Sequence, residues 1–183
     1  LEYGDEYLLE ECLTGTEHSA EMLFNATGES IHFHLCDRFF DYTSNIPIEL
    51  GHVNPSRLSI QQAARIKIAI LLAAKALGVT IGPFKCDMMW TDDGPKILEC
   101  TARCSGGWDS QWTYPQSSGD NLLRRILQVA CDLPVDPQPP EPDQPRYVAC
   151  AAIIPKQTGQ ITQLPALTPS WKGDTHCRLI WHV

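Results

Sequence analysis

Two acidic residues, Asp87 and Glu99, have the type and spacing that could support chemistry. Each lies in a short stretch where polar and apolar residues alternate, as they do in β-strands. The turn signal Asp92-Asp93-Gly94 separates the two stretches and predicts a β-hairpin. With residues 92–94 as the loop, the register places Asp87 opposite Glu99 on one face. Carboxylates in such a pair lie roughly 5 Å apart at Cβ and repel each other, so a compensating group is expected.

A magnesium ion is the natural compensating group, because Mg²⁺ is a hard cation that one or two carboxylates bind together with substrate phosphates. Arg103 lies two residues past Thr101 and would add a fixed positive charge for a phosphate or a carboxylate. The alternative is a solvated hairpin face with ordinary acidic residues and no ligand. The hairpin by itself leaves both interpretations open.

The choice of loop length decides whether the two carboxylates share a face. A loop of two residues would shift the pairing by one position and put Asp87 and Glu99 on opposite faces. The longer loop is preferred because it keeps both faces of the hairpin uniform. The other pairs that it predicts are Thr91–Pro95, Met89–Ile97, Met88–Leu98 and Cys86–Cys100.

Strands that precede the hairpin are predicted from the same alternation. Residues 7–13, 17–24 and 30–38 read as strands separated by turns, which predicts an antiparallel meander. Residues 39–58 are irregular and include His52, which alone indicates nothing. We expect a loop there that connects two elements and could form one wall of an active site.

Two helices are predicted on either side of the hairpin. Ser59 and Gln62 form a capping box, and Gly78 closes the first helix, whose many Ala, Ile and Leu residues predict that much of its circumference is buried. The second helix is predicted over residues 118–131, after a loop rich in glycine and aromatic residues. Its candidate N-caps are Ser118 and Asp120.

Composition narrows the class of protein. The chain has 183 residues, enough for one domain with a real core or for one domain with a small appendage. A net charge of −8 without a basic block argues against a nucleic-acid partner, and no apolar run is long enough to cross a membrane. No signal peptide is visible, so a cytoplasmic location is expected. The eight cysteines contain no CxxC pair and are expected to be reduced.

The chain is expected to have three parts. Residues 1–133 form an α+β unit, residues 134–145 are a proline-rich linker, and residues 146–183 form a small β unit. Within the last part, strands are expected near residues 147–154, 161–164 and 178–183. Because the chain begins at Leu1 and ends on an apolar stretch, we expect it to belong to a longer protein.

Several motifs taken in order resemble the ATP-grasp superfamily of carboxylate–amine or carboxylate–thiol ligases. The similarity covers roughly residues 5–133 and corresponds to the C-terminal half of the ATP-grasp fold, an antiparallel sheet flanked by helices. The motifs that carry it are LLEECLTGTEHS, GPFKCD, KILECTAR, and SGGW with the following SSGDNLL. Each motif is weak alone, and their order makes the set specific.

The resemblance implies site residues and cofactors. It implies that ATP and Mg²⁺ (or Mn²⁺) bind here, with Arg103 facing the transferred phosphate. It places Asp87 and Glu99 as metal ligands, with Thr101 at the position where the family usually has an asparagine ligand. The positions implied to contact ATP are Glu10, Glu11, Cys12 and Leu13 for adenine, Glu17 for ribose, and the basic residue Arg38. The phosphate-binding lysines and the glycine-rich flap of the family have no counterpart in this sequence.

The resemblance implies a ligase that joins a carboxylate to an amine or thiol through an acyl phosphate. The small-molecule substrates would be that carboxylate and that amine, and the chain would form a homo-oligomer or associate with the missing N-terminal half. A different hypothesis is a non-catalytic ATP-grasp-like module that binds a nucleotide or metabolite. A cysteine-based enzyme is a weaker third hypothesis, because the spacing singles out no Cys–His pair.

Overall fold

The computed structural model describes residues 7–43, 46–140, 145–152, 154 and 159–160. The chain divides into two compact units, Leu1–Ile153 and Ile154–Val183, and every described helix and strand belongs to the first unit. The predicted strands at residues 161–164 and 178–183 lie outside the described residues. The boundary predicted at residue 146 therefore stays a prediction.

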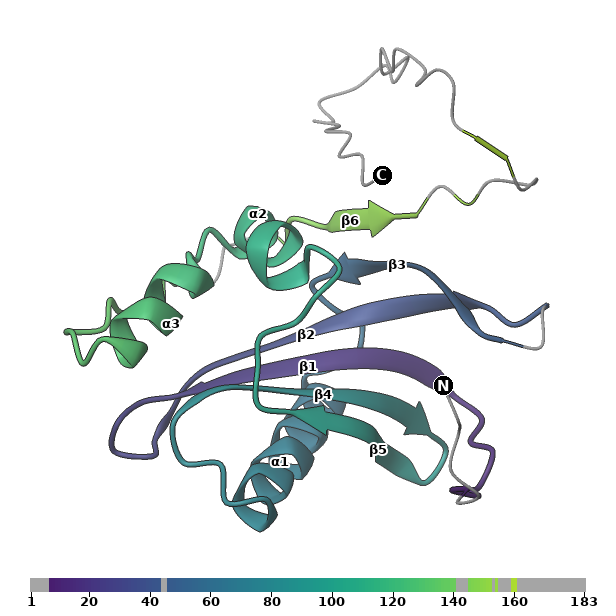
Figure 1. Ribbon diagram of the computed structural model, residues 1–183, viewed down its shortest axis with the longest axis horizontal. Coiled ribbons are helices and arrows are strands. Elements are labelled where there is room, and N and C mark those ends of the chain that lie inside the picture. Colours follow the sequence, from purple (N-terminus) through teal and green to yellow (C-terminus); the bar gives the residue numbers. More distant parts are fainter. Residues whose placement is uncertain (1–6, 44–45, 141–144, 153, 155–158, 161–183) are drawn as a thin grey trace. The chain divides into compact units, whose positions relative to one another are not determined.

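A six-stranded sheet in the order β5-β4-β1-β2-β3-β6 organises the first unit (Figure 1). Each pair of neighbouring strands is antiparallel, which confirms the predicted α+β class with an antiparallel sheet. The strands are β1 (Thr16–Phe24), β2 (Ser30–Asp41), β3 (Ile48–Asn54), β4 (Gly82–Thr91), β5 (Gly94–Thr101) and β6 (Val148–Ala151).

Alternation along the strands gives the sheet one apolar and one polar face. Apolar side chains of β1, β2 and β4 pack on one face into the main core, against the helix α1 (Ile60–Ala76). The residues between them on the same strands point to the other face, and many of these are polar and buried. The buried polar residues that alternate with the core include Ser19, Glu21, His34, Lys85 and Asp87.

The first helix begins and ends as predicted. Ser59 accepts a hydrogen bond from the backbone of Gln62, whose side chain accepts one from the backbone of Ser59, and Gly78 has a positive φ of 71° after the helix. The expectation that most of its circumference is buried is wrong. Only a stripe that includes Ile66 and Ile70 is fully buried, because the helix lies on the sheet with one face.

The polar face of the sheet is covered by the chain after β5, on the opposite side from α1 (Figure 1). This segment contains a π-helical turn η1 (Asp109–Thr113) and the helices α2 (Tyr114–Ser118) and α3 (Leu122–Ala130). The helix predicted over residues 118–131 is found as α3, but it begins later than predicted, because Ser118 belongs to α2 and Gly119, with φ 77°, ends that helix. The N-cap of α3 is Asn121, whose side chain accepts a hydrogen bond from the backbone of Arg124. The predicted N-caps, Ser118 and Asp120, do not have this role.

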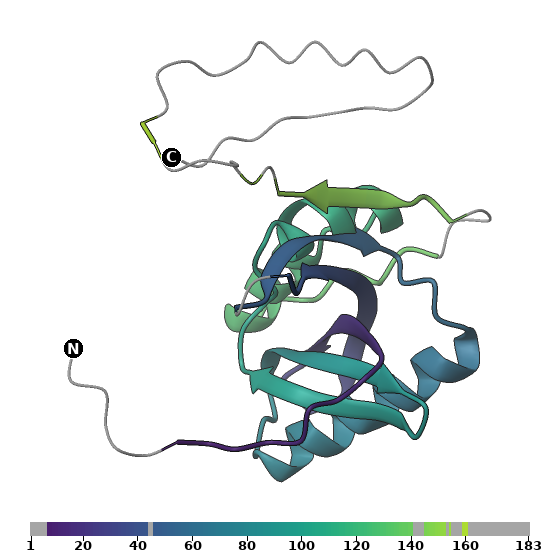
Figure 2. The same cartoon turned by 90° about the vertical axis from the view of Figure 1, so that its right-hand side faces the viewer.

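Two of the three strands predicted for the meander, residues 17–24 and 30–38, are confirmed as β1 and β2. Residues 7–13 form no strand, and the segment before β1 runs away from the sheet as an extended chain (Figure 2). Leu8 and Leu9 are 85% and 97% exposed, so no neighbouring strand supplies the hydrogen bonds that a strand needs. The third strand is β3, which lies in the stretch that we expected to be irregular.

The last described strand, β6, pairs with β3 and lies at an edge of the same sheet. Gly51 of β3 makes this pairing possible, because a Cβ atom there would lie 2.0 Å from the carbonyl oxygen of Cys150. Its φ of 145° also excludes most other residues. Among the described residues, no helix has the length and apolar character required to span a membrane.

Candidate functional site

The hairpin of β4 and β5 carries the two predicted carboxylates, and Asp87 pairs with Glu99 as expected. The predicted loop length is nevertheless wrong, because Thr91 pairs with Gly94 and leaves only Asp92 and Asp93 in the loop. The register shifts between Asp87 and Met88, where β5 has one extra residue, Leu98, that lacks a partner in the ladder.

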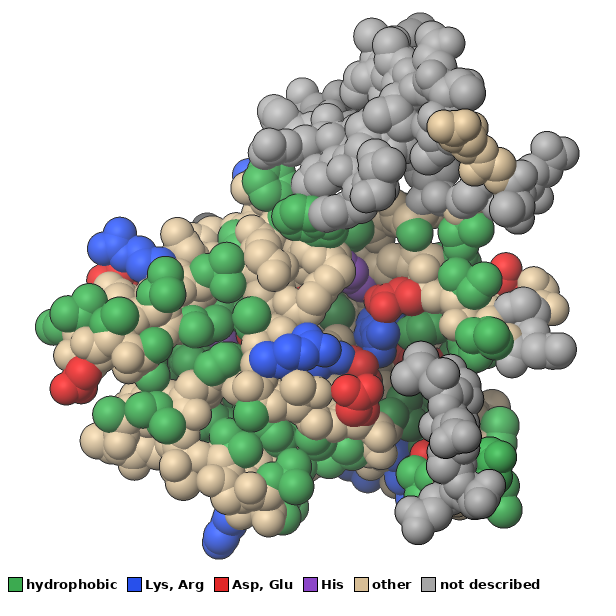
Figure 3. Space-filling view, viewed as in Figure 1, with side chains coloured by type: hydrophobic (Ala, Val, Ile, Leu, Met, Phe, Trp, Pro, Cys, Tyr) green, Lys and Arg blue, Asp and Glu red, His purple; other side chains and the backbone are tan. Residues whose placement is uncertain are grey.

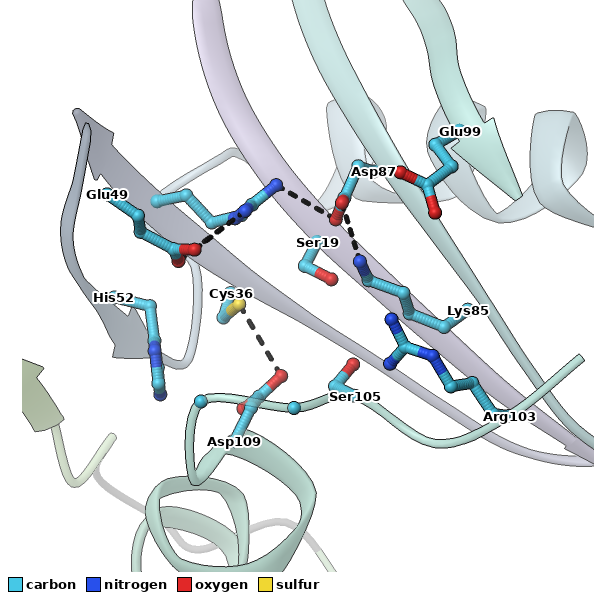
Figure 4. Close-up of a pocket in the computed structure, with 13 residues that line it drawn as sticks. Ser19, Cys36, Glu49, His52, Lys85, Asp87, Glu99, Arg103, Ser105 and Asp109 are labelled. Carbon is cyan, nitrogen blue, oxygen red and sulfur yellow. Dashed lines mark hydrogen bonds and ion pairs between the residues drawn. The ribbon is translucent and has the colours of Figure 1, made fainter. Parts of the chain in front are cut away.

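The bulge at Leu98 corrects the shift that the shorter loop introduces. Nearer the turn, the observed pairs Thr91–Gly94, Met89–Lys96 and Met88–Ile97 replace those that we predicted. Beyond the bulge, the predicted pairs Asp87–Glu99 and Cys86–Cys100 are confirmed. Asp87 and Glu99 therefore share a face of the sheet, and Figure 4 shows their carboxylates beside each other.

Two basic side chains hold the carboxylate of Asp87. Nζ of Lys85 donates a hydrogen bond to Oδ2 at 2.5 Å, and Nη1 of Arg38 lies 3.0 Å from Oδ1. The Arg38 contact is a charge pair without hydrogen-bond alignment, so Oδ1 has no hydrogen-bond partner although it is buried. Arg38 also donates to both carboxylate oxygens of Glu49. A chain of alternating charges thus links β4, β2 and β3.

The predicted third ligand position, Thr101, lies beside Glu99. The Thr101 hydroxyl donates a hydrogen bond of 3.2 Å to Oε1 of Glu99, and both side chains are at least partly accessible. The site therefore combines one buried carboxylate with an accessible carboxylate and a hydroxyl. All three groups lie on β4 and β5, the two strands at one edge of the sheet.

These residues open into a pocket of about 230 Å³ on the polar face of the sheet. In the space-filling view, acidic and basic side chains gather around a hollow near the middle of this face (Figure 3). Figure 4 shows that strands supply one wall and the loop after β5 supplies the other. The lining residues are Ser19, Cys36, Arg38, Glu49, His52, Lys85, Asp87, Glu99, Arg103, Ser105, Gly106, Gly107 and Asp109.

Arg103 lies on the loop that closes the pocket, and its side chain is exposed. Nη1 of Arg103 donates a hydrogen bond to the carbonyl oxygen of Cys104, and the rest of the guanidinium faces the pocket (Figure 4). Its predicted position near the two carboxylates is thus the position that the structure shows.

The residues implied to contact adenine are not brought to this pocket. Glu10, Glu11, Cys12 and Leu13 lie in the extended segment before β1, and none of them lines the pocket. Glu17 lies on β1, in the interior of the sheet, and accepts a hydrogen bond from the hydroxyl of Tyr42. Glu17 therefore lies on an interior strand, and residues 7–13 form no strand beside it.

A buried cluster of Glu21, His34 and Asp109 anchors the loop wall of the pocket. One ligand atom from each lies within 4.8 Å of the others, an arrangement that could hold a metal ion. Each carboxylate already has protein partners. Oε2 of Glu21 accepts hydrogen bonds from the backbone of Ser105 and the hydroxyl of Ser110, and Oδ2 of Asp109 lies 3.3 Å from Nε2 of His34. We therefore assign the cluster to holding the loop.

The charges of this cluster shift its pKa values in opposite directions. Burial alone would lower the pKa of His34, but the negative charges of Asp109 and Glu21 raise it above the usual value. Burial would raise the pKa of Asp109, but the charge of His34 and its hydrogen bond hold that pKa well below the usual value. These opposite shifts favour an ion pair between protonated His34 and ionised Asp109, although both residues are buried.

A second connection ties η1 to β3. Asn54 donates hydrogen bonds to Asp109 and to Oγ1 of Thr113, and Thr113 also lies 2.8 Å from Nε2 of His52. Burial lowers the pKa of His52, which keeps this imidazole neutral near pH 7. His52 thus lines the pocket as a neutral donor or acceptor.

Sequence reasoning missed several pocket residues. Lys85 lies two residues before Asp87 in an alternating stretch, and that spacing could have identified it as a partner of the carboxylate. Glu49 and His52 were missed because the strand β3 was not recognised. Glu21 and Asp109 gave no signal, because their contacts join residues that are far apart in the sequence. Glu21 bonds to Ser105 and Ser110 across 84 and 89 positions, and Asp109 contacts His34 across 75 positions.

Comparison with known proteins agrees with this geometry. The family described as the ATP-grasp domain matches residues 2–111. Carnosine synthase 1 of Gallus gallus is 27% identical over 146 residues, which are 79% of this chain and 15% of that protein. Carnosine synthase 1 of Mus musculus is 27% identical over 171 residues, which are 91% of this chain and 20% of that protein. The chain thus spans a fifth or less of the length of these relatives.

A solved structure with the same fold is the L-amino acid ligase from Bacillus licheniformis, with a TM-score of 0.66 and 23% identity over 80% of this chain and 35% of that chain. Phosphoribosylglycinamide synthetase from Anaerococcus prevotii has a TM-score of 0.60 and 20% identity, over 67% of this chain and 30% of that chain. These identities support the fold alone. Together with the family match across the sheet and the hairpin, they show that the chain belongs to the ATP-grasp family.

Proposed function

We propose that the chain forms part of an ATP- and Mg²⁺-dependent ligase that joins a carboxylate to an amine. The observation that carries this proposal is the pairing of Asp87 and Glu99 on one face of the hairpin, beside Arg103 and at the mouth of a charged pocket. The printed names of its relatives, carnosine synthase and L-amino acid ligase, support an amino acid as one substrate.

The hairpin residues fit Mg²⁺. Oδ1 of Asp87 is a buried oxygen without a hydrogen-bond partner, Glu99 offers an accessible carboxylate opposite it, and Thr101 adds a hydroxyl. These are hard oxygen donors, which Mg²⁺ prefers, and they are few enough to leave room for phosphate oxygens. Asp87 and Glu99 would hold the ion, with Thr101 as a weak ligand or a partner of a bound water. When bound, the ion would neutralise part of the negative charge on the phosphates of ATP.

In the proposed reaction, the substrate carboxylate attacks the γ-phosphate of ATP and releases ADP, and the amine then displaces phosphate from the acyl phosphate. Negative charge gathers on the phosphoryl oxygens during the first step. The accessible guanidinium of Arg103 is placed to stabilise that charge, and Lys85 and Arg38 keep Asp87 from repelling it. Glu49, also in the pocket, is 40% exposed at its side chain and shares Arg38 with Asp87, so it would keep part of its negative charge for an ammonium group.

We also propose which residues would contact the adenine and the ribose of ATP. Residues Glu10 to Leu13 would lie along adenine and Glu17 would bind the ribose hydroxyls. Supporting this, Glu17 shares the polar face of β1 with the pocket residue Ser19. The exposed residues of the segment before β1 would then become covered by the nucleotide or by further protein.

One observation favours a second candidate function, a module that binds a metabolite without turnover. Lys85 and Arg38 already neutralise Asp87, which weakens its attraction for a cation. Among the described residues, no second lysine lines the pocket to hold the phosphates of ATP. A metabolite with carboxylate and ammonium groups could bind between Arg103 and Glu49 without reacting.

The two functions are distinguished by trapping the acyl phosphate. The longest protein encoded by the reading frame around this chain is incubated with ATP, Mg²⁺, a panel of amino acids and hydroxylamine, which converts an acyl phosphate to a stable hydroxamate. We expect hydroxamate and ADP to form together with at least one carboxylate. Binding of amino acids by calorimetry without ADP release would instead support the binding module.

A matched pair of variants serves as the control. Glu99→Gln removes a carboxylate that is proposed to bind the metal ion, so it should abolish hydroxamate formation. Because Glu99 is exposed, the protein should stay folded. Glu29→Gln changes an exposed carboxylate in the turn between β1 and β2 and should leave the reaction intact. Equal activity in the Glu99 variant would contradict the assigned role.

A further inference from the structure

The hairpin that carries Asp87 and Glu99 also holds two cysteines on its other face. Cys86 and Cys100 are directly opposed in the register of β4 and β5, and their Sγ atoms are 2.8 Å apart. Cys86 is fully buried in the main core, while Cys100 packs against that core and is partly accessible. In the part of the chain that the structure describes, no other pair of thiols is recorded in contact, and all seven cysteines are free.

The geometry points to a redox modification site, and we propose that Cys86 and Cys100 form a reversible disulfide that fastens β5 to β4. Opposed residues of antiparallel strands have Cα atoms about 4.5 to 5.5 Å apart, which lies within the range that a disulfide spans. The sulfur atoms need only a small approach to bond. No movement of the backbone from its observed register is required.

The oxidant is a small-molecule disulfide of the glutathione type. The accessible Cys100, as thiolate, attacks one sulfur of that disulfide, forms a mixed disulfide and releases one thiolate. Cys86 then loses its proton, attacks the sulfur of Cys100 and expels the second small molecule as a thiolate, which takes up that proton to become a thiol. In total, two protein thiols are oxidised to one disulfide and one small disulfide is reduced to two thiols.

A disulfide between Cys86 and Cys100 would affect how readily the strand β5 opens. β5 lies at one edge of the sheet (Figure 1). Its residues 96–99 are all exposed. Edge strands open more readily than central strands, because only one neighbour holds them. Glu99 lies directly before Cys100, and Asp87 lies directly after Cys86. A covalent bond at this point would suppress opening of the strand that carries Glu99 and Thr101.

Any effect of this disulfide on a cation site rests on the proposed function. Formation of the disulfide itself does not depend on that function. The test therefore uses the chain without ATP, so that its failure can be distinguished from failure of the ligase proposal. The folded protein is equilibrated with oxidised or reduced glutathione, quenched with acid, and mapped by mass spectrometry for linked peptides. Amide exchange is then measured on both forms.

With oxidised glutathione, we expect a linked peptide that joins Cys86 to Cys100 and disappears when reduced glutathione is added. Exchange at residues 96–101 should become about tenfold slower or more in the oxidised form. Two cysteine variants control the assignment. Cys100→Ser should lose the linked peptide and the added protection, whereas Cys104→Ser, which removes a partly accessible thiol just beyond β5, should retain both.

Three results would overturn the proposal. One is wild-type protein in which Cys86 and Cys100 both stay reduced under oxidised glutathione. Another is a link between Cys100 and Cys104 in place of the predicted one. The last is a Cys86–Cys100 link that leaves exchange at residues 96–101 unchanged. Because all three are read from wild-type protein, they do not depend on whether a variant folds.

Discussion

Nζ of Lys85 donates a hydrogen bond of 2.5 Å to Oδ2 of Asp87, two residues further along the same strand. Both side chains are buried, and they point to the same face because they are two residues apart. A cation that approaches Asp87 must therefore compete with an ammonium group that belongs to the protein. We therefore expect Lys85 to reduce the negative charge that Asp87 could offer to a metal ion.

We predict that Lys85→Met strengthens the binding of a divalent cation. The substitution keeps a long apolar stem in a buried position but removes the charge that neutralises Asp87. The dissociation constant for Mn²⁺ alone, measured by electron paramagnetic resonance, should fall on the order of tenfold. Lys96→Met, at an exposed position of the same hairpin, is the control and should change it little. An unchanged constant in the Lys85 variant would contradict this account of Asp87.

The hairpin of β4 and β5 shows which features could be predicted from the sequence and which could not. Alternation and the turn signal were enough to pair Asp87 with Glu99, but the reason given for that pairing was wrong. The loop is shorter than predicted, and the bulge at Leu98 restores the register. A bulge adds one residue without a distinctive composition, so the periodicity of the sequence does not reveal it.

Other differences arise from contacts that are distant in the sequence. Residues 7–13 have the pattern of a strand but no neighbouring strand to pair with, so propensity alone misled us. Conversely, β3 lacks strong alternation and is held between β2 and β6 by its ladder. The capping box of α1 was predictable because Ser59 and Gln62 interact locally. The pocket wall at Asp109 was not, because it depends on His34 and Asn54.

We predict that the His34–Asp109 pair stabilises the fold in a defined pH window. The folded pKa of Asp109 lies below the ordinary value of 3.8, so its contribution is present above that pH and is lost as the pH falls through the folded pKa. The folded pKa of His34 lies above 6.5, so its contribution is complete below that pH and is lost as the pH rises through the folded pKa.

The measurement is the difference in the free energy of unfolding between wild type and His34→Gln, from urea denaturation between about pH 5 and about pH 9. His32, whose pKa burial lowers to about 4, contacts His34, so the comparison is read above pH 6.5, where His32 is mainly neutral in both the folded and unfolded states. The stabilisation due to His34 should decrease above pH 6.5 by up to about 1.4 kcal/mol per pH unit until the raised pKa is passed. A difference that stays constant over the range would show that folding does not raise the pKa of His34.

We predict that Gly51→Ala detaches β6 from the sheet. The new Cβ would meet the carbonyl oxygen of Cys150 at 2.0 Å, and the φ of 145° is unfavourable for alanine. The free energy of unfolding should fall by about 2 kcal/mol or more, and amide exchange in residues 148–151 should accelerate. Gly106→Ala is the control, because a Cβ at that glycine would meet nothing within 4 Å. Equal effects of the two substitutions would argue against a close β3–β6 contact.

The last prediction concerns Glu21, which holds the loop that closes the pocket. Its Oε2 accepts hydrogen bonds from the backbone N–H of Ser105 at 3.0 Å and from the hydroxyl of Ser110 at 2.7 Å. Glu21→Ala removes the acceptor of both donors, and each lost bond to a charged group costs about 1.5 to 3 kcal/mol. Because the donors lie on the loop, part of this cost can be relieved if the loop opens and exposes them to water.

We therefore expect Glu21→Ala to lower the free energy of unfolding by about 2 to 4 kcal/mol and to speed amide exchange at Ser105 more than in α1. Glu21→Gln keeps one oxygen acceptor and should retain most of the protection of the loop. Glu29→Ala, at an exposed carboxylate beyond the end of the same strand, should change neither quantity by more than about 0.5 kcal/mol. Uniformly faster exchange across the sheet in Glu21→Ala would mean that Glu21 supports the whole core and has no particular role in positioning the loop that carries Arg103.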